Sequence, residues 1–191
     1  MIRKMFVLAC VVLVGAGCFA SHAKRYFEMG ASAPAAGEPG FDRTILLDRV
    51  DIDELYDDFR IIYRISPTEV NYYAYNFWAE RPSKTIRNVI RERLIVPGRF
   101  LRVDLESGKD PTDWILKVKV FRIEEVDEAD KWHARLAMDF DLVETISGKV
   151  IATRTFDRSE PLAQKDPGLL AGTLSRILAE EFDAFLRTWE R

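Results

Sequence analysis

The two cysteines have the most definite chemistry in this sequence, and both lie near the N-terminus, at Cys10 and Cys18. Residues 14–18 read Val-Gly-Ala-Gly-Cys, after a positively charged start and an uncharged, mostly apolar stretch. Small residues before a cysteine let a signal peptidase approach the backbone, and the thiol can then accept a diacylglyceryl group. The pattern therefore predicts a lipoprotein signal peptide at residues 1–17 and a lipidated Cys18.

Two other interpretations fit this segment less well. The apolar segment is too short to be a membrane-spanning helix. As a helix, residues 5–17 would extend only about 20 Å, whereas the hydrocarbon core is about 30 Å thick. Acylation at Cys10 is disfavoured because few apolar residues separate it from Lys4. A soluble periplasmic protein with an ordinary cleaved signal stays the main alternative to lipidation at Cys18.

Lipidation would fix the location of the mature protein. Acyl chains such as palmitate contribute about 0.8 kcal/mol per buried CH₂, so a cysteine that carries several chains stays in its membrane. Residues 18–24 are the lipidated cysteine and a short stalk. The residue after Cys18 is Phe19, whereas Asp at that place favours retention in the inner membrane of diderm bacteria. We expect a lipid anchor on the periplasmic face of the outer membrane rather than the inner membrane.

Composition and the remaining reactive residues argue against an enzyme. The chain has 28 basic and 31 acidic residues and a net charge of -3, so no basic excess points to nucleic acid. His22 and His133 are the only histidines, and no G-x-S-x-G motif is present. Residues 51–58 are acid-rich but lack the glycine and the distal glutamate of a calcium-binding loop. We therefore expect no catalytic residue, no metal and no cofactor, and a solvated acidic loop at residues 51–58.

Hydrophobic periodicity predicts strands joined by turns, with two helices. Period-2 alternation is clearest in residues 114–121 and 132–142, which is typical of antiparallel strands with one buried face. Helices are expected at residues 84–95 and after an Asp166 N-cap with Pro167 in the first turn. Further strands are expected at residues 25–29, 44–50, 59–65, 69–75, 99–104 and 150–156. The predicted fold class is α/β (α+β), a single domain over residues 25–191 with a flexible loop at residues 30–43. Its mixed, largely antiparallel sheet is covered by two main amphipathic helices.

An aromatic cluster is the candidate partner-binding site, formed by Tyr72, Tyr73, Tyr75, Phe77 and Trp78. Alternation along one strand would place Tyr73, Tyr75 and Phe77 on one face, and Tyr72 and Trp78 on the other. Aromatic side chains on both faces indicate either a strand buried on both sides or one face that is offered to a partner. The buried-core interpretation is the favoured one of the two.

A basic cluster begins in the first helix region and continues past its end, and it comprises Arg87, Arg91, Arg93, Arg99 and Arg102. Such a cluster could contact anionic headgroups or an acidic partner. A solvated helix face that pairs with Glu92 explains it better.

The order of these segments resembles a known family. A lipobox precedes Arg25-Tyr26-Phe27, a hairpin at residues 63–72, Trp78-Ala79-Glu80-Arg81-Pro82 before a helix, and residues 156–162 before a final amphipathic helix. The sequence resembles the ABC-type transport auxiliary lipoproteins of the paraquat-inducible type, from Cys18 to Trp189. Arg81 departs from the Glu-Pro pair that relatives often carry.

The resemblance implies an α/β fold with covering helices and a role without catalysis. It would assign residues 25–191 to the ABC transport auxiliary lipoprotein domain. Its implied partner is the periplasmic substrate-binding component of an ABC lipid transporter of the mammalian-cell-entry kind, with self-association left open. An envelope-structural lipoprotein is the alternative, followed by a periplasmic hydrolase.

Overall fold

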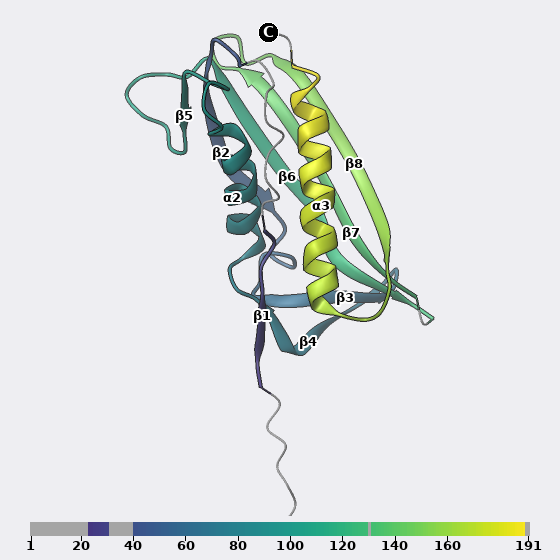
Figure 1. The fold of residues 1–191 in the computed structure, drawn as a ribbon. Helices are drawn as coiled ribbons and strands as arrows, with labels where there is room; N and C mark the ends of the chain where they lie inside the picture. Colours follow the sequence, from purple (N-terminus) through teal and green to yellow (C-terminus); the bar gives the residue numbers. More distant parts are fainter. Residues whose placement is uncertain (1–22, 31–39, 130, 190–191) are drawn as a thin grey trace, which may run out of the picture.

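The computed structural model describes residues 23–30, 40–129 and 131–189. Figure 1 shows a long sheet with two helices packed along it. The elements in chain order are β1 (Arg25–Phe27), β2 (Thr44–Ile52), β3 (Arg60–Ser66), β4 (Glu69–Trp78), α2 (Pro82–Leu94), β5 (Arg102–Asp104), β6 (Trp114–Glu128), β7 (Lys131–Glu144), β8 (Val150–Leu162) and α3 (Pro167–Leu186).

The strands form one mixed sheet, in which β6 is the central strand. The order is β1-β4-β3-β6-β2-β5, and β7 and β8 continue the sheet from β6. Both β2 and β3 pair with β6 in parallel, β2 along its first half and β3 near its end. The longest pairings, β6 with β7 and β7 with β8, are antiparallel. The predicted mixed sheet is confirmed.

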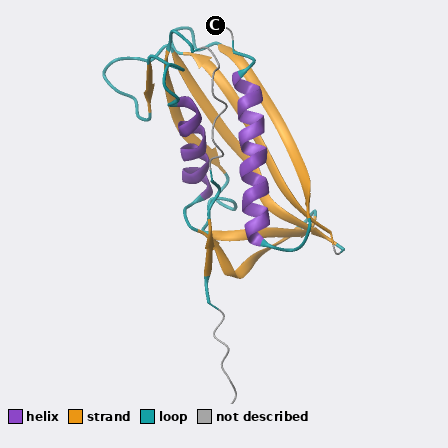
Figure 2. Cartoon of the chain, in the orientation of Figure 1, coloured by secondary structure: helices purple, strands orange, loops and turns teal. Residues whose placement is uncertain are grey.

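Both helices cover the same face of the sheet, as Figure 2 shows. The predicted apolar stripe of α3 is buried there, and the Phe140 ring of β7 packs between Phe182 and Phe185, with centroids 5.4 and 5.5 Å away. The Asp166 carboxylate accepts hydrogen bonds from the amides of Gly168 and Leu169, at 2.7 and 3.1 Å. The expected N-cap and covering helix are thus both confirmed.

Helix α2 begins two residues earlier than expected, with Pro82 in its first turn. The Asp57 carboxylate accepts a hydrogen bond from the Ser83 amide at 3.0 Å, so a distant side chain caps this helix end. The expected solvated basic face is wrong for two residues. Arg93 is buried and pairs with Asp183 at 3.1 Å, and the buried Arg99 donates to the Arg93 carbonyl at 2.6 Å.

Strand β6 contains a bulge and continues past its predicted end to Glu128. The register against β7 shifts between Val120 and Arg122, which reverses the alternation for the rest of the strand. Ile123 and Glu125 then share the helix-covered face, and Glu124 points to the opposite face. Two adjacent glutamates are unusual in a strand interior, so sequence propensity alone ends this strand too early.

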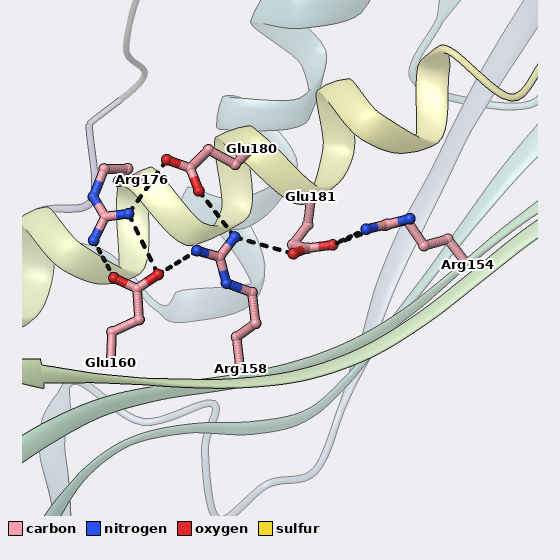
Figure 3. A network of polar contacts seen from close by, with 6 residues as sticks. All are labelled: Arg154, Arg158, Glu160, Arg176, Glu180 and Glu181. Atoms are coloured by element: carbon pink, nitrogen blue, oxygen red, sulfur yellow. Dashed lines mark hydrogen bonds and ion pairs between the residues drawn. The ribbon is translucent and has the colours of Figure 1, made fainter.

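Ion pairs and hydrogen bonds between charged side chains connect α3 to β8. Glu181 of α3 accepts hydrogen bonds from Arg154 at 2.8 and 2.5 Å and from Arg158 at 3.0 Å. Figure 3 shows how these contacts continue along the helix. The full network joins Arg154, Arg158 and Glu160 of β8 to Arg176, Glu180 and Glu181 of α3. Edge strand and helix are held together by alternating charges.

Candidate functional site

The five aromatic residues predicted as a partner-binding site all lie on β4, but they do different jobs. Trp78 is only 4% exposed and belongs to the hydrophobic core. It sits beside Phe27, its partner on β1. Truncation of Trp78 would therefore disturb packing before it could disturb a partner.

An irregularity in β4 overturns the predicted division into two faces. Tyr72 pairs with Ile62 and Phe77 pairs with Arg60, so β4 has extra residues opposite Ile61. Directly paired residues of antiparallel strands point to the same side, which puts Tyr72 and Phe77 on one face. Tyr73 therefore lies on the face opposite to Phe77, not beside it as simple alternation predicted.

The Tyr73 side chain is hydrogen-bonded to a buried carboxylate. Its hydroxyl donates to both Glu125 carboxylate oxygens, at 2.8 and 3.0 Å. Lys165 lies over the Tyr63 and Tyr73 rings, with its Nζ 4.4 and 5.7 Å from the centroids. Burial raises the pKa of the Glu125 carboxyl, while the hydrogen bond from Tyr73 and the charge of Lys165 oppose this rise. Burial also raises the pKa of Tyr73, and the charge of Glu125 adds to the effect.

The exposed part of the cluster lies where the chain enters the body. Tyr26 of β1 is 63% exposed and packs on Phe77, with centroids 5.8 Å apart. Lys24 lies over the Phe77 ring at 5.4 Å. Tyr75 is also exposed. We call Lys24, Tyr26 and Phe77 the entry patch. Tyr26 could not be predicted as part of it, because a strand of three residues has too little alternation to show which face is exposed.

The predicted lipidation site, Cys18, lies outside the described residues, and so does most of the expected flexible loop. The described end of that loop includes Phe41, whose buried ring stacks on Phe100 with centroids 5.1 Å apart. In Figure 1, β1 stands at the opposite end of the body from the C-terminus. Two residues of the entry patch, Lys24 and Tyr26, are among the described residues closest in sequence to Cys18.

The open face of the sheet has its own polar cluster, centred on the buried Glu124. This carboxylate accepts hydrogen bonds from Tyr56 at 2.9 Å and from Arg64 at 2.9 and 3.0 Å. Arg122 and Arg135 lie at 3.9 and 3.8 Å from it. Burial, followed by the charge of Glu124, raises the pKa of Tyr56. Glu124 thus joins side chains of β3, β6 and β7, which suits a structural role within the sheet.

Two further observations bear on function. Within the described ranges, no group of three or more His, Cys, Asp or Glu residues is arranged to hold a metal ion. Neither described helix combines the length and the apolar composition needed to cross a bilayer.

Similarity to solved structures supports the fold. Protein XCC0632 from Xanthomonas campestris has 18% sequence identity and a TM-score of 0.73, over 84% of this chain and 92% of that chain. An uncharacterized protein has 17% identity and a TM-score of 0.67, over 86% of this chain and 97% of that one. No curated protein matches the chain. At such identities the likeness shows the fold alone.

The family is shown by a match to a sequence model. The model of the ABC-type transport auxiliary lipoprotein component matches residues 27–184, from the end of β1 into the last turn of α3. The match covers well over half of the chain and nearly all of the described body. This chain therefore belongs to the family of ABC-type transport auxiliary lipoprotein components.

Proposed function

We propose that this protein is a lipid-anchored component of an ABC-type lipid transport system of the mammalian-cell-entry kind. It is held by Cys18 at the periplasmic face of the outer membrane. There it docks the periplasmic substrate-binding component of the system and catalyses no reaction. The match to the auxiliary lipoprotein family over residues 27–184 carries the proposal.

The entry patch supports the anchored orientation. Residues 19–24 reach at most about 20 Å when fully extended, so Cys18 keeps the β1 end near the membrane. Tyr26 and Phe77 offer aromatic rings there, and Lys24 offers a positive charge. Aromatic side chains suit the headgroup region, and lysine is attracted to anionic lipids. The Lys24 and Tyr26 side chains, which are exposed in water, would thus be partly covered at the bilayer surface.

The polar chemistry of the body supports binding rather than catalysis. Two of the buried carboxylates, Glu124 and Glu125, each contact neighbouring tyrosine and basic side chains. A general acid or base needs access to a substrate proton. Both carboxylates instead join parts of the same sheet.

The proposal is tested on the full chain, expressed with its own signal segment in a diderm host. We expect mass spectrometry to find acyl chains on an N-terminal Cys18, and fractionation to place the protein in the outer membrane. We also expect it to copurify with the periplasmic domain of the mammalian-cell-entry protein of the same transport system.

The Cys18→Ser variant is the matched control, and it should be released in soluble form yet still bind that domain. An unmodified Cys18 in the mature wild-type protein would refute the anchor. An anchored protein that does not bind the domain would refute docking and leave an envelope-structural role.

A further inference from the structure

The end of the body farthest from β1 contains a cavity of about 300 Å³. Its wall includes the first residue of β6, Trp114, and residues near the β7–β8 turn. Six of the lining residues carry the argument: Phe41, Arg43, Trp114, Glu144, Ile151 and Trp189. We call this space the distal cavity. Its volume lies at the lower end of the range for ligand pockets.

The distal cavity has a preformed aromatic wall. The Trp114 and Trp189 rings meet nearly at right angles, with centroids 5.9 Å apart. Phe41 lies 5.6 Å from each of them. All three side chains belong to the hydrophobic core, so the cavity does not depend on mobile surface groups.

Trp189, in the wall of the distal cavity, has a buried hydrogen-bond donor without an acceptor in the described part of the chain. Trp189 is only 5% exposed, and its buried indole Nε1 has no hydrogen-bond partner within the described part of the chain. Buried indole N–H groups usually find an acceptor, because burying one without a partner is unfavourable. A bound group that brings an acceptor to Trp189 would remove this deficit.

The rim of the distal cavity is apolar and exposed. Ile146, in the β7–β8 turn, is 97% exposed, and Val150 and Ile151 at the start of β8 are also exposed. Leu101 is exposed too, and its amide donates to the Arg43 carbonyl at 2.9 Å, which places it beside the cavity. Exposed aliphatic groups around an aromatic pocket are typical of a protein-binding surface.

An edge strand runs away from this rim. β8 pairs with β7 alone among the described strands, so its other edge has no partner strand there. An extended segment lying along such an edge can form main-chain hydrogen bonds and insert alternate side chains into a neighbouring pocket. Asp42, Arg43 and Glu144 border the same space, and side chains of both charge signs there suit a peptide better than a fatty acyl chain.

We infer that the distal cavity binds an extended apolar segment of the periplasmic partner protein. One apolar side chain fills the distal cavity and packs against Trp114 and Trp189, and a backbone carbonyl accepts a hydrogen bond from Trp189 Nε1. The inference rests on the proposed function for the identity of the partner. It adds the place of docking and the chemistry of the segment that docks.

The test uses the mature full chain and the purified periplasmic domain of the mammalian-cell-entry protein of the same system. Ile151→Asp puts a charge on the rim of the distal cavity. Ile65→Asp is the matched control, because Ile65 is 39% exposed against 42% for Ile151 and lies on β3, at the other end of the body. We expect Ile151→Asp to weaken binding at least about tenfold, and Ile65→Asp to change it less than about twofold.

A second measurement follows the indole N–H resonance of Trp189, assigned with Trp189→Phe. It should move downfield when the periplasmic domain binds, as expected for a new hydrogen bond. Equal effects of the two aspartate variants would overturn the inference while the proposed function survives. A shift caused by phosphatidylglycerol vesicles alone would overturn it in favour of a lipid ligand. A wild-type chain that does not bind the domain would refute the proposed function, and this inference with it.

Discussion

Removal of the Tyr73 hydroxyl tests whether this residue belongs to the fold or to a binding surface. In Tyr73→Phe the ring stays beside Tyr63, at a centroid distance of 5.1 Å, so packing is preserved. Glu125, which is fully buried, loses both hydrogen bonds from this hydroxyl. Its remaining cationic neighbour is Lys165, at 3.9 Å. The variant therefore leaves a buried carboxylate with a weaker set of partners.

The expected loss of stability depends on pH. A hydrogen bond to a charged group contributes about 1.5–3 kcal/mol, and a neutral one about 1 kcal/mol. The pKa of Glu125 is raised above its ordinary 4.5 in the folded protein. The folded state thus keeps a proton that the unfolded chain has lost, and the stability due to this group falls as pH rises from 4.5 through the folded pKa. Without Tyr73 that pKa rises further, so the decline extends to higher pH.

We expect Tyr73→Phe to lower the free energy of unfolding by about 2 kcal/mol at pH 8 and by about 1 kcal/mol near pH 4.5. Urea unfolding followed by tryptophan fluorescence measures both values on the mature chain. Tyr72→Phe is the control, because no hydrogen bond of the described structure uses the Tyr72 hydroxyl, and it should cost less than about 0.5 kcal/mol. The reasoning would be refuted if Tyr73→Phe had the same effect at both pH values, or if the two variants were equally destabilised.

Three further predictions concern stability and use the same urea assay. Glu181→Gln should cost about 1–2 kcal/mol, because it leaves Arg154 and Arg158 with weaker partners, whereas the more exposed Glu180→Gln should cost less than about 0.5 kcal/mol; equal losses would contradict the buried role of Glu181. Trp78→Ala should cost about 3–5 kcal/mol, and Tyr26→Ala less than about 0.5 kcal/mol, in line with their burial. Asp166→Ala should cost about 1 kcal/mol through loss of the α3 cap, and an unchanged midpoint would refute that assignment.

Much of the fold could be predicted from local patterns because those patterns are regular. The first half of β6 alternates regularly between buried and less buried residues, β7 alternates over most of its length, and the buried stripe of α3 follows the helical period. The cap of α3 also depends only on neighbouring residues, since Asp166 receives amides from its own first turn. Such features need no knowledge of distant contacts.

The errors arise where the backbone departs from a simple period. One extra residue in β6 and several in β4 reverse which side chains share a face, and a sequence gives no sign of such a shift. For this reason Tyr73 and Phe77 lie on opposite faces of β4, although simple alternation predicts that they share one face. Burial of Arg93 likewise depends on a distant partner, because Asp183 comes from the other helix. The five aromatic residues of the candidate site thus all lie on β4, but they are divided between its two faces differently from what simple alternation predicts.

The long central strands connect the two surfaces assigned to binding. β6 contains 15 residues, which extend about 50 Å, and it runs from Trp114 at the distal cavity to the end where β3 pairs with it. β7 and β8 pair along most of this length, so the connection is a hydrogen-bonded sheet and not a flexible chain. The stalk adds at most about 20 Å. If Cys18 is in the membrane, the length of the folded strands therefore sets most of the distance between the membrane and the distal cavity. The partner must then reach the distal cavity from the periplasmic side.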